Sequence, residues 1–272
     1  MIKLSSFILD GKRADQLGLA MLRQSQRPVL PGTTDRTLQI PGKHGAWDFG
    51  AELGPRLFNI EVAFVEQNAA ALQRKVSELA AFLVDAYGRP RTMELIFTIQ
   101  PDRKYFVRYS GSLPIERISG LGRFTLPLIA YDPFAYSLVP NDEVTWGSEA
   151  VTFENDFYTY GHEGGQIETI TASKIMNVVV LGSISVRPKI ILSGNGSNVV
   201  ISANGKSLGI DDLDHATWVI DCMNYTVTKN GDNALHLVSG DFLEFFTGSN
   251  QVFITGSSMN FTVRFSFYDK FV

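Results

Sequence analysis

Short β-type segments separated by turn residues recur through the second half of the chain, with no helical pattern between them. The runs are rich in valine, isoleucine and aromatic residues and return about every ten residues. Asn204-Gly205 and Asn230-Gly231 are dipeptides that fit tight hairpin turns, and Gly194–Gly196 and Gly248–Asn250 are expected to be turns as well. This pattern predicts an antiparallel β-sandwich. The predicted strands are Ile175–Leu181, Lys189–Leu192, Val199–Ile201, Trp218–Cys222, Tyr225–Val227, Phe242–Phe246, Val252–Ile254 and Phe261–Phe265.

The first half contains one strong helix signal, from about Asn68 to Tyr87. Asn68 is a good N-cap, and apolar residues recur at three- and four-residue spacing as far as Tyr87. Gly88 and Pro90 are expected to end the helix. Polar residues occupy the opposite face, so the helix should lay one apolar stripe on a sheet.

Alternating apolar residues on both sides of this helix predict an antiparallel sheet. Pro101-Asp102-Arg103 is expected to be the turn of a hairpin, and Pro127 is expected at an edge or a bulge. The predicted strands are Leu57–Phe64, Met93–Ile99, Tyr105–Tyr109, Leu113–Ile118 and Phe124–Ala130. The chain is therefore predicted to be mainly β with one helix, as an α+β domain followed by a β-sandwich.

The domain boundary is predicted at residues 139 and 140. A chain of 272 residues is long enough for two cores. Residues 1–139 hold 17 Lys and Arg against 13 Asp and Glu, net +4, whereas residues 140–272 hold 7 against 15, net −8. The two domains should therefore face different partners, and the mild positive charge of the first does not indicate specific nucleic-acid binding.

The segment from about Asp15 to Pro55 is rich in Pro, Gly, Arg and Thr and shows little periodicity. It is too long for a plain connection within a compact domain. Two interpretations remain open: a wandering surface loop, or an arm that becomes ordered against a neighbouring subunit.

Residues for catalysis or for a cofactor or metal site do not form recognisable patterns, so we expect no enzyme and no cofactor. The four histidines are scattered, and nucleophile-elbow, P-loop and dinucleotide-binding motifs are absent. The acidic run Asp211, Asp212 and Asp214 beside His215 lacks the pattern of a calcium loop, and we interpret it as a surface turn. The single cysteine, Cys222, lies in a predicted strand and is expected to be a buried thiol.

No apolar run is long enough to span a membrane and no secretory signal begins the chain, so we expect synthesis in a cytoplasm.

Exposed aromatic residues on the sandwich are a second possible source of function, because an aromatic ring can stack on a sugar ring. Trp146 and Trp218 are the candidate carbohydrate contacts. The alternative is that these rings pack in the core, as aromatic residues in β patterns usually do.

Several segments, in this order and spacing, resemble the distal tail protein family of long, non-contractile-tailed bacteriophages. The resemblance runs nearly from end to end of the chain. The segments are Ile40–Gly45, the central helix, Pro101–Gly111, Tyr131–Ser137, Ile220–Leu235, Ser239–Phe242 and Gly248–Asn250.

The resemblance implies a structural hub of the tail tip, located in the virion and made in the host bacterial cytoplasm. The first domain would close a six-membered ring around a channel for DNA, and the second would be galectin-like. Expected partners are further copies of the chain, as a homohexamer with or without stacked rings, the tail tube protein, the tail-tip or tail-fibre protein and the receptor-binding protein, with no membrane contact.

A closed ring needs heterologous contacts, which an arm docked along a neighbour's sheet can supply. The candidate arms are Thr33–Trp47 and the hairpin around Pro101. The candidate interface residues are Thr33, Asp35, Arg36, Lys43, His44, Trp47, Pro101, Asp102 and Arg103. The alternatives to the hub are a lectin-like adhesion protein that binds carbohydrate and, with no residue constellation behind it, a glycoside or peptidoglycan hydrolase.

Overall fold

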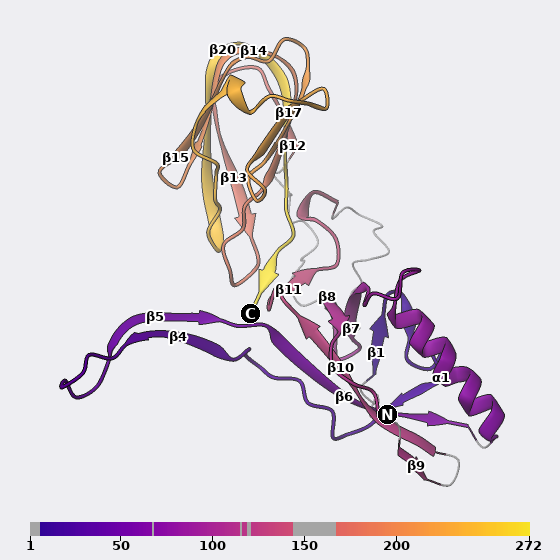
Figure 1. The fold of residues 1–272 in the computed structure, drawn as a ribbon. Helices are drawn as coiled ribbons and strands as arrows, with labels where there is room; N and C mark the ends of the chain where they lie inside the picture. Colours follow the sequence, from indigo (N-terminus) through magenta and orange to yellow (C-terminus); the bar gives the residue numbers. More distant parts are fainter. Residues whose placement is uncertain (1–5, 67, 115, 119–120, 144–166) are drawn as a thin grey trace. The chain divides into compact units, whose positions relative to one another are not determined.

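The computed structural model describes residues 6–66, 68–114, 116–118, 121–143 and 167–272. The chain divides into two compact units, one ending at Ala135 and the other running from Tyr136 to Phe271. The described residues are mostly strand and contain one α-helix, α1 (Ala69–Leu83), which confirms the mainly β prediction (Figure 1).

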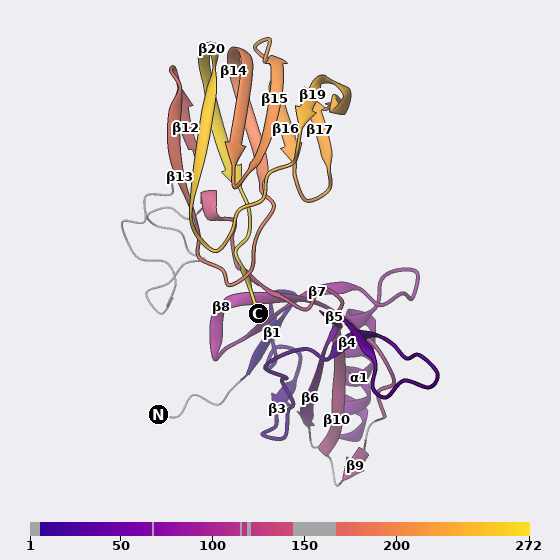
Figure 2. The ribbon, with the colours of Figure 1, turned by 90° about the vertical axis from the view of Figure 1, so that its left-hand side faces the viewer.

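The first unit is built on an antiparallel sheet in the order β2-β1-β7-β8-β10-β6-β3, with β9 added beside β10. Figure 2 shows α1 lying along one face of this sheet. The strands are β1 (Phe7–Leu9), β2 (Lys12–Arg13), β3 (Leu19–Met21), β6 (Arg56–Val65), β7 (Thr92–Phe97), β8 (Gln100–Tyr109), β9 (Glu116–Ile118) and β10 (Leu121–Ala130).

The core of the first unit follows from the alternation in these strands. Phe58, Ile60, Val62 and Phe64 point to one face of β6 and are buried, as the sequence predicts. Residues of β7, β8 and β10 join them, with the Phe58 and Tyr105 rings edge-on at 4.9 Å between centroids. Burial of each such side chain stabilises the fold by about 1.5–3 kcal/mol.

Helix α1 begins as predicted but ends earlier. The Asn68 side chain accepts hydrogen bonds from the backbone N–H groups of Ala70 and Ala71, which is an N-cap. The helix stops at Leu83 because the Asp85 side chain accepts from the N–H groups of Tyr87 and Arg89 and closes a turn. Tyr87, predicted to lie on the apolar stripe, is 86% exposed instead.

The predictions for two prolines of this unit differ in outcome. The turn predicted at Pro101 is wrong, because Phe97 pairs with Gln100 and the turn between β7 and β8 is Thr98-Ile99. Pro101 lies in β8, within the register shift that ends where Tyr105 pairs with Leu95. Pro127 pairs with Asn59 of β6, but the pairing of β10 with β8 covers only Leu128 and Ile129, so the proline lies at a local edge, as predicted.

The second unit is an antiparallel sandwich with one hydrophobic core. Its largest fully buried side chains include Trp218, Phe245, Phe261 and Phe265. Its elements are β11 (Ala135–Ser137), a 3-10 helix η1 (Asn141–Glu143), β12 (Ile167–Ile170), β13 (Lys174–Val180), β14 (Lys189–Ala203), β15 (Lys206–Asp212), β16 (Thr217–Asp221), β17 (Thr226–Lys229), β18 (Asp232–Asn233), a 3-10 helix η2 (Leu235–Leu237), β19 (Val238–Gly240), β20 (Gly248–Ser266) and β21 (Lys270–Phe271).

Two long strands, β14 and β20, supply both layers of this sandwich. Their pairing changes register between Asn195 and Val200, where both strands bend. The first half of β14 pairs with β16 and its second half with β15, while the two halves of β20 pair with β13 and β12. Figure 1 shows both strands arching over one end of the unit, so each contributes to two facing layers.

Two of the four turn predictions are correct and two are wrong. Asn204-Gly205 and Asn230-Gly231 form turns with positive φ at both residues, as predicted. Gly194–Gly196 lies within β14, at its bend, and Gly248–Asn250 lies within β20, so both turn predictions are wrong. The predicted strand Phe242–Phe246 is not a strand, although Phe245 forms one isolated bridge with Val186.

Gly194 at the bend should tolerate no side chain. Its φ is +134°, and a Cβ there would lie 2.5 Å from the carbonyl oxygen of Asn260 and 2.6 Å from the Cα of Phe261. We therefore expect Gly194→Ala to lower the free energy of unfolding by more than about 2 kcal/mol, measured by urea denaturation. Gly205→Ala is the control, because Gly205 also has positive φ but has nothing within 4 Å of its Cβ position. Equal losses for both variants would contradict the packing argument.

Candidate subunit interface

The segment expected as a loop or an arm contains a β-hairpin. Strands β4 (Thr33–Leu38) and β5 (Trp47–Leu53) pair with each other and with no other strand among the described residues. Every residue of both strands is exposed. Figure 1 shows the hairpin running away from the sheet that contains β6. The sequence segment is thus more regular than predicted, and the signal that reasoning missed is the alternation of Trp47, Phe49, Ala51 and Leu53.

A bulge in β5 places the apolar side chains of the hairpin on both of its faces. The pairs Asp35–Ala51 and Thr37–Asp48 leave one extra residue on β5, at Phe49-Gly50. Side chains at alternate positions of β4 share a face. Leu38 and its partner Trp47 therefore lie on the same face as Arg36, whereas Ala51 and Leu53 lie on the other face.

The face that carries Leu38 and Trp47 also carries an ion pair. The side chains of Arg36 and Glu52 are 2.8 Å apart, and Thr34 lies directly across from Glu52. Both charged side chains are about two-thirds exposed, so the pair adds little stability.

The apolar side chains of the hairpin are largely exposed. Phe49 is 67% exposed and Trp47 is 52% exposed. A two-stranded hairpin is marginally stable in water on its own, and several exposed apolar residues on one element mark a contact surface. The hairpin therefore has the properties of an arm that is completed by another molecule.

The tip of the hairpin is the loop that contains Lys43 and His44, both exposed. The Lys43 ammonium lies 3.8 Å from the centre of the Trp47 ring, a cation–π contact that holds the loop against the end of β5. The structure therefore brings together six of the nine predicted interface residues, namely Thr33, Asp35, Arg36, Lys43, His44 and Trp47.

The remaining three predicted interface residues do not belong to this arm. Pro101, Asp102 and Arg103 lie in β8. The side chains of Asp102 and Arg103 are only 10% and 17% exposed and face each other at 3.4 Å. They follow the Thr98-Ile99 turn directly, in the part of β8 that has no partner on β7, and their interface role stays a prediction.

One of the two candidate carbohydrate contacts can be placed in the structure. Trp218 is buried, and its indole N–H donates to the backbone oxygen of Leu213 at 3.1 Å. It packs in the core and presents no ring to a ligand, as the packing alternative predicts. Trp146 lies outside the described residues.

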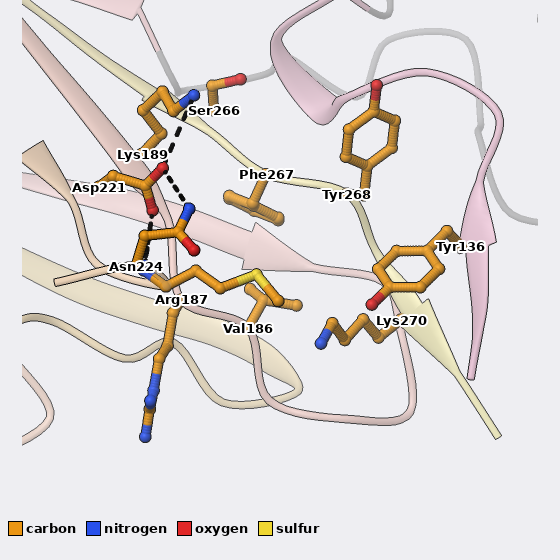
Figure 3. A pocket seen from close by; sticks show the side chains of 11 residues that line it. Tyr136, Val186, Arg187, Lys189, Asp221, Asn224, Ser266, Phe267, Tyr268 and Lys270 are labelled. Carbon is orange, nitrogen blue, oxygen red and sulfur yellow. Dashed lines mark hydrogen bonds and ion pairs between the residues drawn. The ribbon is translucent and has the colours of Figure 1, made fainter. Parts of the chain in front are cut away.

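A cavity of about 200 Å³ opens in the second unit (Figure 3). Phe267, Tyr136 and Tyr268 form an aromatic side, and Lys270 lies 5.2 Å from the centre of the Tyr136 ring. At the other end lies the carboxylate of Asp221, which does structural work in the turn after β16. It accepts from the backbone N–H groups of Met223 and Asn224 and from the Asn224 side chain, at 3.0–3.1 Å.

The described part of the chain contains no group of three His, Cys, Asp or Glu side chains placed to hold a metal ion. Burial raises the pKa of the Cys222 thiol to about 12, so the reactive thiolate is not formed near neutral pH. Among the described residues, no helix is long and apolar enough to cross a membrane.

Comparison with known proteins gives the following matches. Residues 12–130 match the phage tail protein RIFT-related domain family. The chain is similar to the SPP1 Dit (gp 19.1) protein, described as a paradigm of hub adsorption apparatus in phages that infect Gram-positive bacteria, at 16% identity and TM-score 0.69 over 99% of this chain and 100% of that one. A chain of the phage P2 baseplate in its activated conformation with Ca matches at 9% identity and TM-score 0.40 over 95% and 97%. No curated protein sequence matches significantly.

The turn held by Asp221 should give a pH-dependent stability. Burial raises the pKa of this carboxyl, but the Asn224 and Met223 hydrogen bonds and the nearby Lys189 outweigh burial, and the pKa lies below its usual value. A lowered pKa contributes stability that is present above the unfolded pKa of about 3.9 and is lost as pH falls through the folded pKa. We expect Asp221→Asn to cost about 1 kcal/mol in urea denaturation at pH 7 and nearly nothing at the lowest pH where the protein stays folded. A cost that does not change with pH would contradict this.

Proposed function

We propose that this protein is the structural hub of a phage tail tip, because residues 12–130 match the phage tail protein RIFT-related domain family and the whole chain has the fold of the SPP1 Dit protein. In this proposal six copies form a ring that joins the tail tube to the tail-tip or tail-fibre protein and the receptor-binding protein. The ring leaves a channel for DNA. The protein would be made in the host cytoplasm and would act in the virion.

The observation that carries this proposal is the set of exposed apolar side chains on the β4–β5 hairpin. Leu38, Trp47, Phe49 and Leu53 remain in water in the isolated chain. Covering each of them by a neighbour stabilises the contact by up to about 1.5–3 kcal/mol. A protein whose function is assembly has a reason to keep such a surface, whereas a monomeric binding protein does not.

The hairpin also suits the geometry of a ring. It leaves the sheet of its own unit and exposes apolar side chains, so it can dock on a different surface of the next copy. Such a heterologous contact generates a ring when the rotation between copies closes. The number six comes from the resemblance to distal tail proteins, and the measured mass of the assembly tests it.

Two features favour a structural role over the alternatives. The raised pKa of the buried Cys222 and the lack of a metal-holding group among the described residues speak against a thiol nucleophile and a metal centre for a hydrolase. The burial of Trp218 removes one of the two candidate rings of the lectin-like alternative.

Ring formation should depend on the exposed apolar side chains of the hairpin and not on its ion pair. We expect Phe49→Ser/Leu53→Ser to weaken each contact between copies by roughly 2 to 4 kcal/mol, and thus to convert rings into monomers. Light scattering after size-exclusion chromatography gives the mass, and negative-stain images show whether six-fold rings are present.

The matched control is Arg36→Ser/Glu52→Ser, which removes the ion pair of the same hairpin and leaves the net charge unchanged. It should still form rings. Both double variants alter exposed residues, so their urea midpoints should equal that of the unmodified protein. Rings that persist in Phe49→Ser/Leu53→Ser, or an unmodified protein that stays monomeric at high concentration, would reject the proposal.

A further inference from the structure

The second unit has an outward sheet face that carries almost no charge. It is formed by β13, the first half of β20, the second half of β14, β15 and β19, which lie side by side. We name it the neutral face. Its outward residues are Ile175, Asn177, Val179, Ser249, Gln251, Phe253, Thr255, Val200, Ser202, Ser207, Gly209 and Ser239.

The strand register places these residues in rows across the sheet. One row runs from Ile175 through Phe253 and Ser202 to Ser207. The next runs from Thr255 through Val200 and Gly209 to Ser239. Successive residues in a row are direct neighbours, because paired side chains on one face of a sheet lie about 5 Å apart.

The lack of charge on this face is unusual for this unit. Residues 140–272 hold 7 basic and 15 acidic residues, and the first acidic side chain on the neutral face is Asp211, near the end of β15. Lys206, at the other end of β15, is paired with Glu244 at 3.1 Å. A ligand that lies across these strands therefore meets no charge at the centre of the face.

Phe253 lies in the middle of the face. It belongs to an interior strand, yet 42% of its side chain is exposed, and Ile175 beside it is 57% exposed. Amide and hydroxyl side chains surround this apolar centre, with Asn177 and Gln251 on one side and Ser202 and Thr255 on the other.

We propose that the neutral face binds an uncharged saccharide chain. One face of a sugar ring is apolar through its C–H groups and can cover Phe253, while the hydroxyl groups at its edge can bond to amides and hydroxyls, each of which both donates and accepts. An anionic polymer would find no cation here. A protein partner is a weaker fit, because the cores of protein interfaces are depleted in serine.

The size of the face is consistent with a short stretch of such a chain. Neighbouring strands lie about 4.8 Å apart, so the distance from β13 to β15 is roughly 14 Å. This site differs from the cavity in Figure 3 and from the buried Trp218, and the inference does not depend on ring formation.

Affinity electrophoresis of the full chain in native gels tests the inference. The gels contain dextran or galactomannan as neutral polymers, or polygalacturonate as an anionic one. We expect at least one neutral polymer to retard the protein and polygalacturonate to have no such effect. Phe253→Ser should weaken the interaction about tenfold or more, which corresponds to about 1.4 kcal/mol.

A matched pair of variants provides the control. Ile175→Ser changes the neutral face on β13, whereas Ile167→Ser changes an equally exposed isoleucine on β12, in the other layer. Ile175→Ser should weaken retardation and Ile167→Ser should not, with unchanged urea midpoints for both.

Retardation by neither neutral polymer, or equal retardation of Phe253→Ser and the unmodified protein, would overturn the inference. The inference would also be overturned if Phe253→Ser changed the mass of the assembly and did not change retardation by the saccharides. That result would show that another copy covers this face. Ring mass is measured on the same samples, so failure here is distinguishable from failure of the hub proposal.

Discussion

The antiparallel pairing of β14 with β20 is the interaction on which the second unit depends. The two strands remain hydrogen-bonded from Lys189 and Ser266 to Ser202 and Phe253 while they bend from one layer into the other. Both layers therefore grow outward from a single pair of strands, and their inner faces meet in one core. The bend is possible because Gly194 adopts a φ that a side chain would not tolerate and because Asn198 also has positive φ.

The constraint on the first unit is apolar surface. Its sheet buries most of this surface, but the unit leaves the rest exposed. The sheet around β6 buries its alternating side chains against its neighbours and α1, whereas β4 and β5 form a separate hairpin exposed on both faces. Since β5 leads after two residues into β6, a rigid sheet determines where the hairpin starts. The buried sheet therefore stabilises the unit, while the exposed hairpin is available for contact with other molecules. Residues of the hairpin can change without loss of the fold.

The sequence was most informative where side-chain periodicity agrees with burial. Phe58 to Phe64 and the N-cap Asn68 follow from local pattern alone, and the structure has them as predicted. Prediction failed where the backbone of a distant strand decides the outcome. Gly194–Gly196 has the composition of a turn, but pairing with Asn260 and Phe261 keeps it in a strand. Pro101 has the composition of a turn residue, but the two-residue loop before it places it in β8.

For the candidate sites, too, local sequence pattern was informative and the pairing of distant strands could not be predicted. Six of the nine predicted interface residues lie on the arm because composition singled out that segment, yet the exposed apolar residues of β5 beyond Trp47 were missed. The neutral face could not be read from sequence, because Ile175, Phe253 and Ser202 become neighbours only through the register of three strands.

The buried thiol also makes this protein convenient to label. Cys222 is its only cysteine, and a thiol with a pKa of about 12 does not react with maleimides in the folded state. A cysteine introduced on the arm would thus be the sole attachment point for a fluorophore or spin label, without removal of the native cysteine. In any assembly that the copies form, distances between labels would then report how the arms are arranged.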